Sequence, residues 1–155
     1  MSGSDLPTAP TALAAPPGLA APGPAFSRVR RLTCSQVRRA AELLRDLGID
    51  PDAVFGIVGY SGVIEVPFYE ERHIIVLVFA DTALVFPDGP RESPHRYAGM
   101  ALCMWYPDDP VNARWTPDNG IDDLLYRVRN HLFREAWWRH TKEWLGAEAP
   151  HGAAA

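Results

Sequence analysis

The sequence predicts an α+β domain with the order helix, four-strand meander, long loop and two further helices. One observation behind this is that apolar residues recur at helical spacing on both sides of a central segment rich in Val, Ile and aromatic residues. The other is that tight turns divide this central segment. Connections that short join antiparallel strands, because a parallel crossover needs a dozen or more residues. Helices placed around an antiparallel run of strands are typical of the α+β class.

Residues 1–27 differ in composition from the rest of the chain. They hold six of the 15 prolines and one charged residue, Asp5, with Ala, Gly, Ser and Thr filling most other positions. Such a stretch cannot bury enough apolar surface to offset the entropy of ordering it. It also lacks the basic start and unbroken apolar run of a signal peptide. We therefore expect a disordered Ala/Pro-rich tail at 1–27, a folded domain over 28–151 and a loose end at 152–155.

The first helix is expected over residues 33–47. Thr33, followed by Gln36 three positions later, has the form of a capping box. Gly48 and Pro51 then supply the residues that end a helix. The apolar residues between them lie on one face at helical spacing: Val37, Ala40, Ala41, Leu44 and Leu47.

Four strands and two more helices are expected after this helix. Val, Ile and aromatic residues fill 55–60, 63–68, 73–79 and 83–86, and turn residues bound each segment. This pattern predicts a four-stranded antiparallel meander. Residues 93–104 are expected to be irregular. Apolar spacing then predicts one helix over 121–133 and another over 135–145.

Composition excludes several classes of protein. Fifteen Lys and Arg against 19 Asp and Glu give a net charge of −4, which argues against a nucleic-acid partner bound by bulk electrostatics. The two cysteines, Cys34 and Cys103, do not make a disulfide framework, so we expect a cytoplasmic location. The longest apolar run, 74–79, is too short to span a membrane, so no membrane partner is expected.

The most informative motifs lie between residues 94 and 125. A cysteine stands in the apolar setting Leu102-Cys103-Met104, eight residues after His95, and Trp115-Thr116-Pro117 follows. A helix headed by Ile121, Leu124 and Leu125 comes next. In this order, behind a helix and a meander, these motifs resemble the active-site region of the ubiquitin-conjugating enzymes. That family has a four-strand meander, a His-Pro-Asn loop, a catalytic cysteine in an Ile/Leu-Cys-Leu setting and a Trp-Ser-Pro motif.

The end of the chain resembles bacterial members of that family. The similarity lies in Thr141-Lys142-Glu143-Trp144-Leu145-Gly146 and Glu148-Ala149-Pro150-His151. Those bacterial proteins are encoded in antiphage (CBASS) operons beside a nucleotidyltransferase that makes cyclic oligonucleotides. The resemblance implies that Cys103 accepts the C-terminus of a protein as a thioester and passes that acyl group to an amine. It implies that the acyl donor is either the cyclic-oligonucleotide synthase or a ubiquitin-like protein.

Cysteine suits this chemistry because its thiolate is both a strong nucleophile and a good leaving group. The resemblance implies no metal or organic cofactor, and the spacing of the histidines and cysteines matches no zinc pattern. The chain has no phosphate-binding loop, so activation of the acyl group would come from a separate activating enzyme or be bypassed.

Departures from the family pattern leave several roles open. The asparagine of His-Pro-Asn has no counterpart in Ser93-Pro94-His95-Arg96-Tyr97. His95 is therefore either a catalytic residue that supports an oxyanion or orients the thiol, or a strut that braces the loop. Asp108, Asp109 and Trp115 are candidates for binding the substrate. The two acids are also candidates for deprotonating an incoming lysine, and a solvated turn is the alternative role for both.

The function itself has two rivals. The chain can be a catalytically inactive binding module or scaffold that keeps the shape of a conjugating enzyme. It can also be an unrelated α+β binding domain in which Cys103 is a buried core residue, since free cysteines are often buried. Cys34, at the predicted start of a helix, is expected to be structural.

Overall fold

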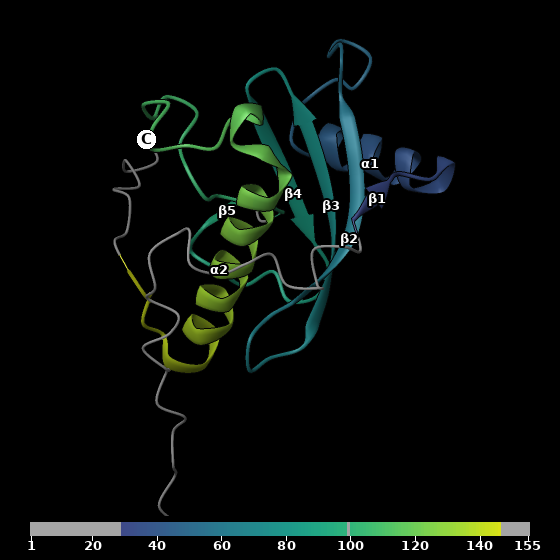
Figure 1. The fold of residues 1–155 in the computed structure, drawn as a ribbon. Coiled ribbons are helices and arrows are strands. Elements are labelled where there is room, and N and C mark those ends of the chain that lie inside the picture. The colour runs from purple at the N-terminus through teal and green to yellow at the C-terminus, as the bar shows by residue number, and fades with distance from the viewer. Residues whose placement is uncertain (1–28, 99, 147–155) are drawn as a thin grey trace, which may run out of the picture.

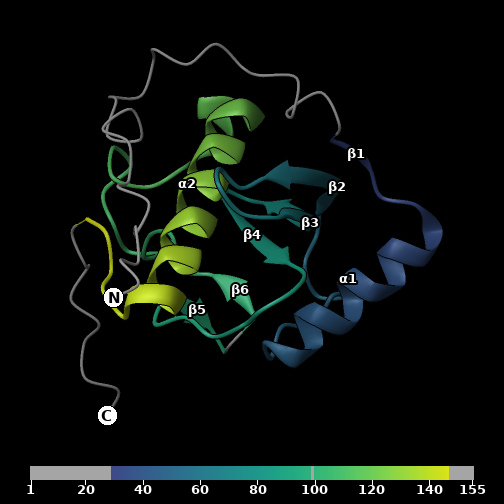
Figure 2. The same ribbon diagram turned by 90° about the horizontal axis from the view of Figure 1, so that it is seen from below.

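The structure is a computed structural model that describes residues 29–98 and 100–146. The predictions for residues 1–27 and 152–155 lie outside this range. A four-stranded sheet forms the middle layer, with one long helix on each side of it (Figures 1 and 2). The elements follow the order β1 (Arg30–Arg31), α1 (Cys34–Asp46), β2 (Val58–Glu65), β3 (Glu71–Phe79), β4 (Thr82–Pro87), β5 (Arg96–Tyr97), β6 (Ala101–Leu102), a 3-10 turn (Pro117–Asn119) and α2 (Gly120–Thr141).

The first helix, α1, begins and ends as its sequence predicts. The Thr33 hydroxyl accepts a hydrogen bond from the Gln36 N–H, and the Gln36 side-chain oxygen accepts one from the Thr33 N–H at 2.9 Å. This confirms the capping box. After the helix, Gly48 has a φ of +77°, a conformation that a residue with a Cβ rarely adopts.

The four-stranded antiparallel sheet is confirmed, but two of its strands were predicted wrongly. The segments expected at 55–60 and 63–68 are parts of one strand, β2, which continues through Ser61 and Gly62. Both residues pair with β3, opposite Ile75 and Ile74, so they are extended ladder positions and make no turn. The turn comes later, where Phe68 has a φ of +67°.

The fourth strand of the sheet is β1, which precedes α1. It pairs antiparallel with the middle of β2, with Arg30 opposite Ser61 and Arg31 opposite Tyr60. The order across the sheet is therefore β1-β2-β3-β4, and only the last three strands form a meander. Two arginines carry no apolar pattern of their own, so this strand could not be predicted from the sequence.

Each face of the sheet is covered by one helix. On one face, Ala40, Leu43 and Leu44 of α1 pack against a cluster that includes Leu77 and Phe86. On the other face, the core is larger. It joins α2 to the sheet and to two tryptophans of the long loop, and includes Ile64, Ile74, Val76, Val85, Trp105, Trp115, Leu124, Leu125, Val128 and Leu132.

The C-terminal region contains one helix where the sequence predicted two. α2 runs unbroken for 22 residues because no Pro or Gly interrupts it between Phe133 and Glu135. The helix ends at Thr141, short of the expected 145, where Lys142 adopts a φ of +63°. Among the described residues, no helix has the length and apolarity to cross a membrane.

The segment expected to be irregular, 93–104, contains a small hairpin. Its strands β5 and β6 pair antiparallel, with Arg96 opposite Leu102 and Tyr97 opposite Ala101. In Figure 2 this hairpin lies beside β4, at the end of the sheet layer. The two strands are two residues each, which is too short to give a readable alternation in the sequence.

Candidate functional site

Cys103 follows the last residue of β6 and is half-buried. Its backbone N–H donates to the carbonyl oxygen of His95 at 2.9 Å, which extends the hairpin ladder by one position. Side chains two positions apart on a strand point to the same face, and so do residues directly opposite each other. Tyr97 and Ala101 are opposite each other, so Cys103 lies on the face of the hairpin that carries Tyr97.

Tyr97 contacts the Cys103 thiol. Its hydroxyl donates to the carbonyl oxygen of Trp105 at 2.5 Å, and the Cys103 side chain lies near enough to affect the ionisation of the same phenol. Burial first, and then Cys103, raise the pKa of Tyr97 well above its ordinary value. The phenol therefore keeps its one proton and donates it to the Trp105 carbonyl oxygen; rotation of the hydroxyl away from that oxygen would direct the proton to the Cys103 sulfur instead.

Asp109 and Tyr106 complete the group around the thiol. The Asp109 carboxylate accepts a hydrogen bond from the Tyr106 backbone N–H at 2.9 Å. Desolvation and the nearby charges of Cys103 and Asp109 raise the pKa of Tyr106. The structure thus brings two predicted site residues, Cys103 and Asp109, together with two tyrosines that the sequence analysis did not single out. No sequence signal distinguishes these tyrosines from core aromatics.

The long loop after Cys103 is fixed to the sheet by Arg114. Its Nε donates to the Asp109 carbonyl oxygen at 3.1 Å, and its terminal nitrogen pairs with the Asp81 carboxylate, in the β3–β4 turn, at 2.8 Å. These contacts hold Asp109 in place relative to the sheet. Asp108, the neighbouring candidate, is exposed.

Trp115 does not have the exposed surface that a substrate-binding residue needs. The side chain is 2% exposed, and its indole N–H donates to the Gly120 carbonyl oxygen at 2.9 Å. Its ring lies 6.5 Å from that of Trp105 within the core under α2. The expected role in substrate binding is therefore corrected: Trp115 anchors the end of the long loop by burial.

The His95 side chain points into the core beside α2. It is 5% exposed, its ring centre lies 4.1 Å from that of Trp144, and the His131 ring lies 6.3 Å away in an edge-on arrangement. The His95 carbonyl oxygen accepts from Cys103 N–H and faces His131 Nε2 at 3.2 Å. Of the two roles predicted for His95, this geometry favours the strut.

Substituting His95 separates the two roles. As a strut, His95→Ala should lower the free energy of unfolding by about 1–2 kcal/mol, because a buried ring contact is lost. Any loss of acyl transfer should then match that of Trp144→Ala, which removes the other half of the same contact. As an oxyanion donor, His95→Ala should instead slow transfer by about 10²-fold at nearly unchanged stability. Denaturant titration and transfer assays on both variants decide between them.

A buried ion pair holds the hairpin that carries Cys103. Arg96 donates to both carboxylate oxygens of Glu135, at 2.6 and 2.7 Å, and the side chains are 1% and 0% exposed. The same guanidinium donates to the Met100 carbonyl oxygen at 2.9 Å, inside the hairpin turn. Glu135 thus fixes β5 and the turn to α2. The sequence contains one indication of this buried ion pair: Glu135 comes three residues after Leu132, so it is an acidic residue on the apolar face of α2.

Two further nitrogen-bearing side chains lie beside this carboxylate. His131 Nε2 and Arg139 lie 3.4 and 3.6 Å from the Glu135 oxygens. Burial alone would raise the pKa of Glu135, but the hydrogen bonds from Arg96 and His131 outweigh it and lower the pKa from 4.5 to about 2. Arg72 of β3 is buried nearby, and burial followed by the charges of Arg139 and Arg96 lowers its pKa.

Tyr97 gives a test of the thiol environment. Tyr97→Phe should slow alkylation of Cys103 by roughly tenfold at pH 7, because the variant has no hydroxyl that can donate to the sulfur. Tyr60→Phe, on β2 under Arg31, is the matched control and should leave the rate unchanged. Equal rates for Tyr97→Phe and the unaltered protein at pH 7 would contradict this role.

Among the described residues, no group of three or more His, Cys, Asp or Glu side chains is arranged to hold a metal ion.

Comparison with known proteins identifies no family for this chain. The chain has no match among protein-family models, among curated proteins or among solved structures. Its function is therefore argued from the residues around Cys103.

Proposed function

We propose that this protein is a ubiquitin-conjugating-like acyl carrier with Cys103 as its nucleophile. The Cys103 thiolate attacks the activated C-terminal carbonyl of a donor protein, the activating group leaves, and a thioester forms. The amine of an acceptor, a lysine side chain, then attacks the thioester, and the thiolate leaves. The observation that carries the proposal is the cluster of Cys103, Tyr97, Tyr106 and Asp109 at the start of a long surface loop.

Each member of the cluster has a role in this scheme. The Tyr97 hydroxyl stabilises the sulfur in both steps, because in both the sulfur carries negative charge at the start or at the end. The Asp109 carboxylate accepts the proton that the amine releases as it attacks. The Arg114 contacts fix the loop that carries this carboxylate, and the Tyr106 backbone N–H binds the carboxylate itself.

The sequence resemblance supports the choice of donor and setting. We propose that the donor is a cyclic-oligonucleotide synthase or a ubiquitin-like protein, in a bacterial antiphage (CBASS) system and in the cytoplasm. Either a separate activating enzyme supplies the activated acyl group, or this activation step is bypassed. No organic cofactor takes part in either transfer step, since the thiol and the amine supply both nucleophiles.

The proposal is tested with the proteins encoded beside this gene. A neighbouring gene for a nucleotidyltransferase or a ubiquitin-like protein supports the proposed donor. Incubation of the chain with these proteins and ATP should give a covalent adduct that a thiol reductant removes. No adduct, or one that resists reductant from the start and forms without Cys103, would contradict the proposal.

A second candidate is the inactive binding module, which one observation favours. The His95 side chain is buried against Trp144 and is turned to α2, and the family's asparagine has no counterpart in this chain. On this alternative the protein binds the same partners through the same surface without acyl transfer. Partner binding that persists without any adduct would favour it.

A further inference from the structure

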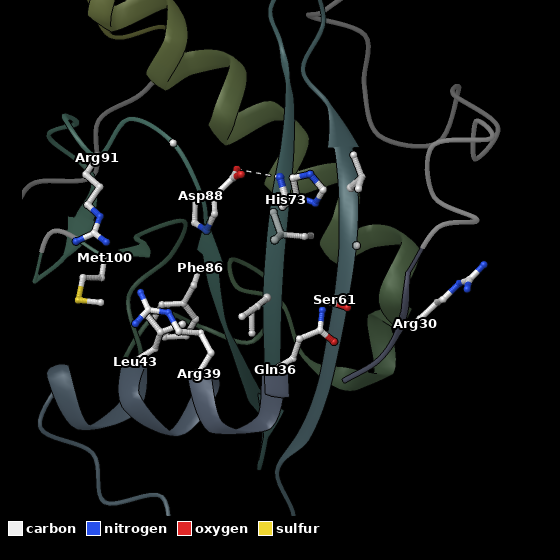
Figure 3. Close-up of a pocket in the computed structure, with 16 residues that line it drawn as sticks. Arg30, Gln36, Arg39, Leu43, Ser61, His73, Phe86, Asp88, Arg91 and Met100 are labelled. Carbon is white, nitrogen blue, oxygen red and sulfur yellow. Dashed lines mark hydrogen bonds between the residues drawn. The ribbon is translucent and has the colours of Figure 1, made fainter. Parts of the chain in front are cut away.

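A groove lies on the α1 face of the sheet, in the part that α1 leaves uncovered (Figure 3). It encloses about 500 Å³, a volume typical of ligand sites. Its floor is apolar and comes from α1 and the strands, through Leu43, Ile75 and Phe86. Met100, in the hairpin turn, forms part of one wall.

The rim of the groove is basic. Figure 3 shows the guanidinium groups of Arg39, from α1, and Arg91, from the loop after β4, pointing toward each other across the opening. His73 adds a third nitrogen-bearing side chain at the upper end. Arg30 also borders the groove, but its side chain points outward in this view.

The acidic residues near the groove are already paired. Asp88 lines it, but its Oδ1 accepts from the His73 N–H at 2.9 Å and from Arg72 Nε at 3.4 Å. Glu42 pairs with Arg39 at 3.1 Å, with both side chains about half exposed, so solvent screens this pair strongly. Within the described residues, Arg91 has no ion pair.

Arg39 and Arg91 both line the groove and both carry positive charge, so an anionic group bound in the groove would be attracted by both. This basic rim contrasts with the protein as a whole, whose net charge is −4. Its positive field would attract an acidic partner in preference to a second copy of this acidic chain.

We propose that the groove binds an acidic peptide segment of a partner protein. Side chains on an extended peptide alternate between two sides, so apolar residues meet the floor at Ile75 and Phe86 while carboxylates meet Arg39 and Arg91. An open apolar floor between charged rims fits such a segment better than a free inorganic anion, which would leave the floor uncovered.

The chain itself does not supply this segment. Residues 1–28 contain one acidic residue, Asp5, and end in Arg28, so they do not complement a basic rim. Residues 147–155 likewise contain one acidic residue, Glu148, so they do not complement a basic rim either. The occupant is therefore a different protein. This inference does not require Cys103 to be a nucleophile.

The test uses a fluorescein-labelled peptide of sequence Glu-Leu-Glu-Leu-Glu-Leu and its Gln-Leu counterpart, with the Cys103→Ala full-length protein so that no acyl chemistry interferes. Anisotropy titration should show binding of the Glu peptide, weakened as salt is raised, and much weaker binding of the Gln peptide. The double variant Arg39→Gln/Arg91→Gln should raise the Kd for the Glu peptide by about tenfold. Arg38→Gln, an exposed α1 position outside the groove, is the matched control and should leave it unchanged.

Three results would overturn the proposal. One is that neither peptide binds. Another is that the Arg38 and the Arg39/Arg91 variants weaken binding equally, since this would indicate nonspecific electrostatic attraction to the protein and no defined binding site. The third is that inorganic tripolyphosphate displaces the peptide at a similar concentration and binds with the same dependence on Arg39 and Arg91, which would make the groove a site for free anions. A failure of thioester formation would leave all these measurements unaffected.

Discussion

Cys103→Ala should abolish the reductant-sensitive adduct and reduce acyl transfer by about 10³-fold or more, because no other group at the site can form a thioester. Cys103→Ser should either convert the adduct into an oxyester that resists reductant or abolish it. Because Cys103 is half-buried, we expect both variants to lower the free energy of unfolding by about 1 kcal/mol or less. Gel mobility with and without reductant, and denaturant titration, measure the two effects.

The second cysteine is the internal control. Cys34 is the first residue of α1 and is exposed, so exposure alone would make it the more reactive thiol. We nevertheless expect Cys103 to alkylate much faster, because the Tyr97 hydroxyl stabilises its thiolate. Cys34→Ser should leave the adduct intact.

The opposite pattern would favour the binding module. In that case Cys103 would resist alkylation in the folded protein, and Cys103→Ala would cost more than about 1 kcal/mol while partner binding continued. The group of tyrosines and Asp109 around the thiol would then be a packing arrangement and not a catalytic one.

Local signals in the sequence predicted local structure well. The capping box at Thr33 and the stop at Gly48 depend on a few adjacent residues, and both are observed in α1. The antiparallel sheet and the presence of C-terminal helical structure were also predictable, because apolar periodicity decides them, although the sequence analysis divided the single helix α2 into two. The prediction failed at Ser61-Gly62, where turn-forming residues occupy the middle of β2 because pairing with β3 outweighs their local preference.

The site was predictable in part. The motif order pointed to Cys103, and the two acids of the loop pointed to Asp109. Tyr97 and Arg96 were not found, because their roles depend on partners that are distant in the sequence or on a hairpin too short to read. The contact between Arg96 and Glu135 joins positions 39 residues apart, and only the packing of α2 against the hairpin brings them together.

The ion pair at this contact gives the largest expected effect on stability. Arg96→Ala should lower the free energy of unfolding by about 3–5 kcal/mol, because it leaves the Glu135 carboxylate buried without its main partner. Arg39→Ala, which breaks the exposed pair with Glu42, is the matched control and should cost about 1 kcal/mol or less. Denaturant titration of the two variants gives both values.

The pH dependence of stability supplies a second measurement of the same pair. The pKa of Glu135 is about 2 in the folded protein, below its ordinary 4.5, so the folded state favours the ionised carboxylate. This contribution, about 3 kcal/mol, is complete above pH 4.5 and is lost as the pH falls from 4.5 toward 2. Glu135→Gln should therefore flatten the loss of stability across this range, while Asp123→Asn, at the part-exposed pair with Arg127, should not.

Replacing both partners distinguishes a role in stability from a role in placing the hairpin. Arg96→Met with Glu135→Leu removes both charges of this pair, but it also removes the carboxylate that Arg139 faces at 3.6 Å, so it should recover part of the stability lost in Arg96→Ala. It does not restore the hydrogen bond from Arg96 to the Met100 carbonyl, which fixes the turn three residues before Cys103. We therefore expect the double variant to fold stably and still transfer acyl groups more slowly than the unaltered protein. Full activity at recovered stability would mean that the hairpin holds Cys103 in place without the ion pair.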